Sequence, residues 1–586
     1  QQNPKINYNN PEDIKSAYQY INRDQYGQWS ILDRKTSLVI NSQGNNESWK
    51  RYTLNPNDVT NEEISKFVWN YQFKEMYLRY FAWQYIGKED WNERSWTRNS
   101  IDGAPLMSMR PLQGVDVFRY FIPIAFMIGL YGMFYHFRRD PQRALSVLTL
   151  FILTGLAIVV YLNQSDPQPR ERDYAYVGSF FAFSIWIGMG IYGLLSELNK
   201  KFNITSLIPS IILIIIMPLL MGVTDWKEHD RSKRYEAWDY AYNLLNSCEP
   251  NAILFTNGDN DTFPLWYIQE VENIRKDVKV VNLSLLNFPS YIRQLDEHNP
   301  SLNMFNIDGE LDLYLKIVES ENYENLMEYA FTNWLKNDYT INLNTETGEN
   351  FTWKFNPGTY GVGLTNITIL KIIEKCFNKN PIYFSTTTGN NNLGLDDYLI
   401  QEGLVYKLSN QLNDTPMDIR MDIDKTIQMI TKSNSENILR NADDFSASSL
   451  KENGIYRYNQ LDNEDIFYGP NIERLAANYR NIFFKTATNI ALDFNRKNHF
   501  KESFDIIDLM NEYFPSNVIP TEISYDYGAL SFCQSLLQVI QFKIEQNINE
   551  LSFNEEIELV DRNIRNLLST VNPELVKKYF PDFYIQ

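Results

Sequence analysis

A dense polar segment, SDPQPRERDYAY at residues 165–176, separates two long apolar stretches of the chain. Its charged and phenolic side chains are Asp166, Arg170, Glu171, Arg172, Asp173 and Tyr174. The planar guanidinium groups suit a phosphate or pyrophosphate headgroup, with the tyrosine as a third binding candidate. The carboxylates are candidates for a general acid or base. The alternative is a self-neutralising loop that fixes helix ends, but so many charges at a membrane face are costly unless used, which favours a functional site.

A second polar segment, NGDNDTF at residues 257–263, follows the apolar run AILFT. Its candidate ligand-binding side chains are Asn257, Asp259, Asn260 and Asp261. Two carboxylates in a DxD pair can hold a divalent cation, and loops at strand carboxyl ends are common ligand sites in open α/β sheets. Nucleotide-sugar glycosyltransferases use such a pair, and haloacid-dehalogenase phosphatases use a similar DxDxT. Because two residues separate the strand from the first aspartate, we favour a turn whose carboxylates cap the following helix.

Four apolar stretches have about the ~20 residues needed to cross a membrane. They cover residues 118–137, 144–162, 176–195 and 207–223, and they predict a multi-pass α-helical membrane domain at 117–226. Lys and Arg gather in the first and third connections, RRDPQR and SELNKKFN, so these connections are expected on the cytoplasmic side. The polar segment, the N-terminal residues and everything after residue 226 are then expected outside the cytoplasm.

The rest of the chain divides by pattern into three further parts. Residues 1–116 contain an aromatic helix at 67–87, expected at the membrane interface or packed on the spanning helices. Residues 227–410 contain a strand–loop–helix–strand order, which predicts an α/β domain with a parallel sheet. Residues 411–586 are helical in pattern, and 472–515 predicts a hairpin of tetratricopeptide type.

The chain has 586 residues and a formal net charge of -19. This acidity argues against a nucleic-acid partner, which needs clustered Lys and Arg. The three cysteines and four histidines are scattered, which argues against a disulfide framework or a structural zinc site. The sequence starts at Gln1 without a signal-peptide pattern, so we expect either a processed protein or the C-terminal part of a longer one.

Three long segments of the chain resemble one protein family. They are NQSDPQPRERDYAYVGSFFAFSIWIG, HDRSKRYEAWDYAYNLLNSC and NAILFTNGDNDTFPLWYIQEVENIRKDVKVVNLSLLN. RYFAWQYIG and IYRYNQLDNEDIFYG agree less specifically. Together they look like glycosyltransferase family 117 of the Bacteroidota, formerly catalogued as a domain of unknown function, and the resemblance covers most of the chain.

The resemblance implies a GT-C-type membrane enzyme similar to protein O-mannosyltransferases. Such an enzyme passes a sugar from a polyprenyl-phosphate carrier to Ser or Thr of an exported protein. It implies a multi-pass protein of the inner membrane with a large periplasmic C-terminal region, whose partners are membrane lipid, the lipid-linked sugar and the acceptor protein. Family members are usually longer at the N-terminus, so the catalytic acid is expected in a missing N-terminal half, with Asp166, Glu171 and Asp173 as weaker candidates.

Two functions of different classes therefore remain open. The first is a membrane glycosyltransferase, of which this chain forms the C-terminal part. The second is a non-catalytic membrane subunit whose large periplasmic region docks partners in a protein-export or envelope assembly, for example beside the secretion translocon. A phosphatase that acts through Asp259 is a third and weaker hypothesis.

Overall fold

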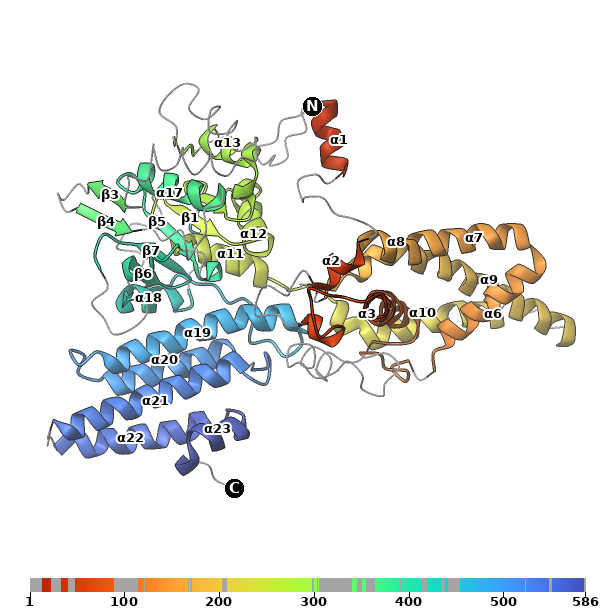
Figure 1. The fold of residues 1–586 in the computed structure, drawn as a ribbon. Coiled ribbons are helices and arrows are strands. Elements are labelled where there is room, and N and C mark those ends of the chain that lie inside the picture. Colours follow the sequence, from red (N-terminus) through yellow and green to blue (C-terminus); the bar gives the residue numbers. More distant parts are fainter. Residues whose placement is uncertain are drawn as a thin grey trace. The chain divides into compact units, whose positions relative to one another are not determined.

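The computed structural model divides the chain into two compact units (Figure 1). The N-terminal unit is Tyr26–Asp230, and the C-terminal unit is Arg231–Gln586 together with Gln1–Gln25. The structure describes residues 13–22, 33–39, 48–88, 114–120, 122–166, 168, 171–202, 208–297, 300–302, 304, 340–344, 350–354, 364–389, 393–412, 420–433, 438–440, 454–521, 523–546 and 551–583.

The elements described in the N-terminal unit are helical. They are α2 (Arg34–Val39), η2 (Ser48–Arg51), α3 (Asn61–Phe67), η3 (Val68–Leu78), α4 (Arg79–Tyr85), α6 (Ile124–Arg139), α7 (Pro141–Thr154), α8 (Leu156–Leu162), η4 (Asp173–Tyr176), α9 (Val177–Phe202) and α10 (Ile208–His229). Local chemistry sets several of their ends. Thr60 and Glu63 form a capping box at the start of α3, and Asp140 caps α7 ahead of Pro141.

The predicted multi-pass membrane domain is wrong for the part of the chain that the structure describes. Two helical segments there are long and apolar enough to cross a membrane, Pro141–Leu162 and Asp173–Lys201, and buried helices of soluble proteins pass the same test. The first expected span is too short, because α6 begins only after Pro123 and has 16 residues, about 24 Å at ~1.5 Å per residue. The fourth falls on α10, part of which lies outside the described residues.

The aromatic stretch at 67–87 is helical, as its pattern predicts. α3, η3 and α4 follow one another directly, and η3 is an 11-residue π-helix. Phe67, Tyr77 and Tyr80 are buried in a core that includes Phe183 and Trp186 of α9. The helix is therefore packed on the candidate spans, one of the two compatible placements expected for it.

The C-terminal unit contains a mixed sheet of six strands in the order β2-β1-β5-β7-β6-β8. The strands are β1 (Ile253–Thr256), β2 (Lys279–Asn282), β5 (Ile382–Ser385), β6 (Leu399–Glu402), β7 (Val405–Leu408) and β8 (Arg420–Met421). β1 is parallel to β2 and β5, whereas β7 is antiparallel to β5 and β6. The predicted βαβ unit is present as β1, α12 (Asp259–Glu270) and β2, but the sheet as a whole is mixed rather than parallel.

Helices cover both faces of this sheet, and β1 shows how. Its Leu254 joins one core with α11 (Glu236–Asn246) and α12, whereas Ile253 and Phe255 join a second core with α13 (Pro289–Glu297) and α17 (Leu364–Cys376). The alternation follows from the period of two in a strand. The other described elements here are α1 (Ile14–Asn22), η5 (Leu285–Asn287), the β3 (Thr340–Asn344) and β4 (Asn350–Lys354) hairpin, η6 (Thr386–Thr388), η7 (Asp396–Tyr398) and α18 (Ile423–Ile430).

A stack of helices follows the sheet (Figure 1). It consists of α19 (Pro470–Leu492), α20 (His499–Tyr513), α21 (Ile523–Glu545), α22 (Leu551–Leu568), α23 (Pro573–Tyr579) and η9 (Pro581–Phe583). α19 and α20 form the predicted hairpin. The tetratricopeptide expectation is wrong, because α19 and α21 begin at Pro470 and Ile523, much further apart than the ~34-residue period of that repeat. The first sheet core continues into this stack.

Candidate functional site

The polar loop between the candidate spans is held at its start by side chains from the preceding helices. α8 ends at Asn163 in a left-handed conformation with φ of 43°. The Asn163 Oδ1 accepts hydrogen bonds from Arg34 and from Gln72 Nε2, the latter at 3.0 Å. Gln72 also donates to the Gln164 carbonyl at 2.9 Å. These buried contacts fix where the loop leaves the helix, because each satisfies a polar group that water cannot reach.

Asp166 is buried and already has partners. Arg51 Nη1 lies 3.1 Å from its Oδ2, and the Tyr52 hydroxyl donates to the same oxygen at 2.7 Å. Burial raises the pKa of Asp166, while these two partners act in the opposite direction. The carboxylate anchors the loop to residues 51 and 52, and Tyr71 strengthens this by donating to the Ser165 carbonyl at 3.0 Å.

Glu171 is paired in the same way, with the helix that contains η3 and α4. Arg79 Nη2 lies 2.8 Å from its Oε2, and the Tyr80 hydroxyl donates to the same oxygen. Arg79 is itself buried and also donates to the Glu75 carbonyl oxygen at 3.0 Å. Thus two of the three candidate acids are paired with arginines outside the loop, whereas the self-neutralising alternative expected pairs within the loop.

The remaining predicted residues of this loop differ in their surroundings. Arg170 lies outside the described residues. Arg172 donates to the Tyr174 hydroxyl at 3.1 Å, and its buried Nε has no hydrogen-bond partner among the described residues. Tyr174 is exposed, and Asp173 opens η4. Among the described residues of the loop, Arg172 is therefore the cation that still has an N–H group to donate to an anion. Sequence reasoning missed Arg51 and Arg79, because nothing local marks an arginine whose partner is about a hundred residues away.

The loop after β1 places its four predicted residues in different roles. Asp261 accepts hydrogen bonds from the backbone N–H groups of Asn257 at 3.0 Å and Gly258 at 2.9 Å, and from the Thr387 hydroxyl. It therefore caps α12, as the turn interpretation expected. Asp259 and Asn260 are exposed on the first turn of the helix. Within the residues that the structure describes, no group of three or more acidic, histidine or cysteine side chains could hold a metal ion.

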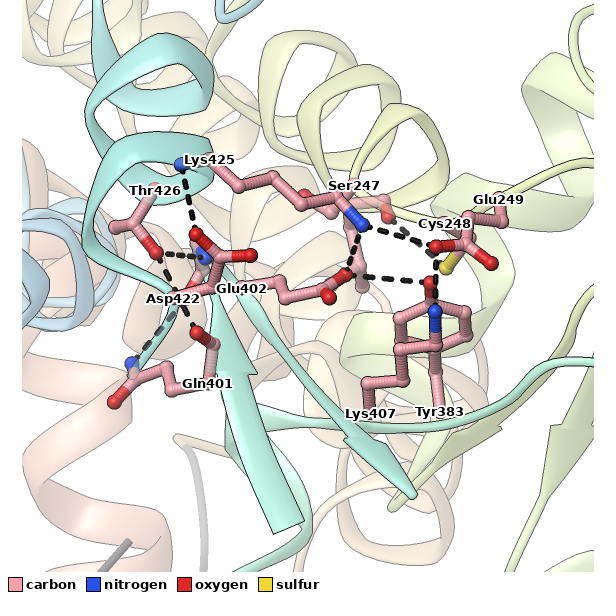
Figure 2. Close-up of polar contacts among 12 residues, drawn as sticks. Ser247, Cys248, Glu249, Tyr383, Gln401, Glu402, Lys407, Asp422, Lys425 and Thr426 are labelled. Carbon is pink, nitrogen blue, oxygen red and sulfur yellow. Dashed lines mark hydrogen bonds and ion pairs between the residues drawn. The ribbon is translucent and has the colours of Figure 1, made fainter. Parts of the chain in front are cut away.

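A charged network that the sequence did not reveal joins side chains of the sheet to α18 (Figure 2). Lys425 of α18 bridges two carboxylates, at 2.5 Å from Glu402 and 3.1 Å from Glu249. Lys407 of β7 lies 2.5 Å from the same Glu249 oxygen, and the Tyr383 hydroxyl donates to Glu402 at 3.3 Å. These side chains come from the α11–β1 turn, β5, β6, β7 and α18, so the network joins five segments.

The pKa shifts of this network follow from burial and pairing. Burial raises the pKa of Glu402 against the lowering effect of Lys425. Burial opposes the charge of Lys425, but Glu402 and Glu249 raise its pKa overall. Burial also works against the charged form of Glu249, yet Lys407 and Lys425 hold its pKa below the usual value. Glu249 and Lys425 are therefore charged at neutral pH.

A pocket of about 480 Å³ opens beside this network. Glu249, Glu402 and Lys407 line it together with Ile400 of β6, Arg420 of β8, and residues 377–382 and 408–411. Its volume lies in the ~300–1,000 Å³ range of small-molecule sites. The pocket belongs entirely to the C-terminal unit.

Comparison with known proteins identifies one part of the chain. The family model of TMEM260-associated domain 2 matches residues 237–345 and 333–425. These residues include all six strands of the mixed sheet, the charged network and the pocket. No solved structure matches the chain. Between residues 237 and 425, therefore, this chain is similar to TMEM260-associated domain 2.

Proposed function

We propose that the chain is part of a membrane glycosyltransferase that transfers a sugar from a polyprenyl-phosphate carrier to Ser or Thr of exported proteins. The observation that carries this proposal is the match of residues 237–425 to TMEM260-associated domain 2, because TMEM260 is a protein O-mannosyltransferase-like family. The sequence resemblance to glycosyltransferase family 117 supports the same reaction class.

In this proposal the polar loop receives the phosphate of the donor. Arg172 supplies the guanidinium, with Arg170 and Tyr174 beside it in the sequence, because a planar, permanently charged fork suits phosphate oxygens. Asp166 and Glu171 position the loop through Arg51 and Arg79. The third acid of the loop, Asp173, makes no side-chain hydrogen bond or ion pair with a described residue. It is therefore a better candidate for proton transfer than Asp166 or Glu171.

The membrane placement is also part of the proposal. The candidate segments Pro141–Leu162 and Asp173–Lys201 flank the loop, and Arg143 and Lys200 lie at their opposite ends. Cations favour the cytoplasmic side, so the loop would face the periplasm from the inner membrane. The C-terminal unit would then meet exported acceptor proteins on that side.

Substitution of Arg172 tests the phosphate role. Arg172→Gln is expected to weaken binding of a polyprenyl-phosphate sugar at least tenfold and to reduce glycan transfer, because it removes a charge-assisted contact. The matched control is Arg143→Gln, at the far end of the first candidate segment from the loop, whose side chain is 85% exposed. Equal donor binding by the two variants, with both proteins folded, would show that Arg172 does not hold the phosphate.

A second function, a non-catalytic membrane subunit, is favoured by one observation. Two of the three acids in the loop are tied into ion pairs, which leaves little acid–base capacity there. In that case the C-terminal unit would dock partners, such as the secretion translocon or another envelope complex. Glycan analysis of exported proteins from a deletion strain separates the two functions. Loss of glycans that only the intact chain restores supports the transferase, and unchanged glycans support the docking subunit.

A further inference from the structure

The sheet beside the pocket carries a row of paired side chains on four neighbouring strands, and those of β7, β6 and β8 line the pocket. The register pairs Tyr383 with Lys407, Lys407 with Ile400, and Ile400 with Arg420. Directly paired residues point to the same face of a sheet. Lys407 and Arg420 therefore flank Ile400 on one face, and all three line the pocket.

The cations of this pocket have donors to spare. Arg420 makes no side-chain hydrogen bond or ion pair with any described residue, and neither does Lys379, which also lines the pocket. Lys407 uses one ammonium contact, with Glu249, and an ammonium group has three donors. Counting Lys425, the pocket and the network together hold four cations, against the two carboxylates Glu249 and Glu402. A local positive excess in a chain of net charge -19 attracts an anion.

The neutral part of the lining suits hydroxyl groups. Asn378, Asn410 and Gln411 supply side-chain amides, and Ser409 supplies a hydroxyl. Amides both donate and accept hydrogen bonds, as sugar hydroxyls do. Phe377 adds an apolar surface to the lining. A purely inorganic anion would leave these groups and most of the volume unused.

We propose that this pocket binds a small saccharide that carries one negative group, a phosphate or a carboxylate. Arg420, Lys407 and Lys379 contact the anionic group, and the amides contact the hydroxyls. The inference rests on the pocket and not on the proposed transfer reaction, although it would give the TMEM260-associated domain 2 a carbohydrate ligand.

Calorimetric titration of the full chain in detergent tests this pocket, with four probes: glucose 1-phosphate, glucuronate, glucose and inorganic phosphate. We expect glucose 1-phosphate or glucuronate to bind at least tenfold more tightly than glucose and than inorganic phosphate. The tighter of the two identifies the anionic group as phosphate or carboxylate. Arg420→Gln should weaken that binding at least tenfold without affecting folding, because the side chain makes no hydrogen bond or ion pair with a described residue.

Arg293→Gln is the matched control, since Arg293 is an exposed arginine of the same unit that lies outside the pocket. It should bind the tighter probe as the unchanged chain does. The proposal is overturned if neither charged sugar binds, if inorganic phosphate binds as tightly, or if Arg420→Gln binds as the unchanged chain does. Saccharide binding to this pocket does not require glycan transfer. A chain that binds the saccharide but transfers no glycan would therefore contradict the proposed function and not the proposed pocket.

Discussion

Arg79 and Glu171 form an ion pair of 2.8 Å that joins the helix preceding the candidate spans to the loop between them. The Arg79 side chain is 7% exposed and also lies 3.5 Å from the Glu75 carboxylate, so one buried cation serves two carboxylates. Its guanidinium stacks on Tyr80 and Trp83 at 4.9 and 4.8 Å. The loop therefore depends on a residue 92 positions earlier in the chain.

Replacing Arg79 with Met should destabilise the N-terminal unit strongly. The change leaves the buried Glu75 and the partly buried Glu171 without their cation, and breaking a fully buried pair costs about 3–5 kcal/mol, which is the upper bound here. The measurement is thermal unfolding of the full chain in detergent. The control is Arg143→Met, whose exposed pair with Asp140 contributes at most about 1 kcal/mol. A midpoint of Arg79→Met equal to that of the control would mean that the pair does not hold the loop.

The helices α6 and α9 should tolerate no side chain at their closest crossing. A Cβ at Gly132 would overlap the Trp186 carbonyl oxygen, and one at Gly190 would overlap the Ile128 carbonyl oxygen. Gly132→Ala and Gly190→Ala should each cost about 1–3 kcal/mol, because backbone cannot yield as a side chain can.

Gly188→Ala is the matched control for this crossing. Gly188 lies in α9, as Gly190 does, but a Cβ at Gly188 would meet nothing within 4 Å. The control should be neutral or slightly stabilising, because Ala favours a helix over Gly. If all three alanine variants unfold at the same temperature in detergent, α6 and α9 do not pack as closely as described.

His499 should make the helical stack less stable in mild acid. The ring is buried, donates from Nδ1 to the Ala491 carbonyl oxygen at 2.7 Å, and lies 3.0 Å from the Lys543 ammonium. Burial and Lys543 lower its pKa, although Glu556 and Asp493 act in the opposite direction. A lowered folded-state pKa means that the unfolded chain binds the proton more tightly, so stability is lost as pH falls below about 6.5.

The check on His499 is the difference in unfolding free energy between the unchanged chain and His499→Gln, measured from pH 8 to pH 5. Glutamine cannot gain a proton, so the variant should lose less stability over this window. Parallel curves for the two proteins would assign the acid loss to other groups.

Asp239 should produce a pH dependence of the opposite sign. This buried carboxylate accepts two hydrogen bonds from Asn459, at 2.6 and 2.8 Å, yet burial raises its pKa to about 6. The folded chain therefore binds the proton more tightly than the unfolded chain. The stabilisation is complete below the ordinary pKa near 3.9 and is lost as pH rises through 6, by up to about 3 kcal/mol.

Asp239→Asn removes this titration and keeps the shape of the side chain. We expect the variant to gain stability relative to the unchanged chain between pH 5 and pH 7, as measured by urea unfolding. A constant difference across that range would show that Asp239 stays ionised in the folded protein.

Local pattern in the sequence was enough for several elements. The β1–α12–β2 unit, the helix through Phe67 and Tyr80, and the α19–α20 hairpin all follow from the spacing of apolar residues and from turn residues between them. The candidate capping role of Asp261 also followed from its place in a short loop. The length of the apolar stretch by itself gave a wrong prediction for the first membrane span, because α6 begins only after Pro123.

The sequence by itself thus determined where most helices and strands lie and which segments are rich in charge. Only the tertiary structure decided which charges meet. Arg51 and Arg79 neutralise a loop about a hundred residues away, and Lys407 and Arg420 share a pocket because strand register aligns both with Ile400. Such pairings depend on how distant elements pack, since the free energy of an ion pair is set by burial and geometry rather than by neighbours in the chain.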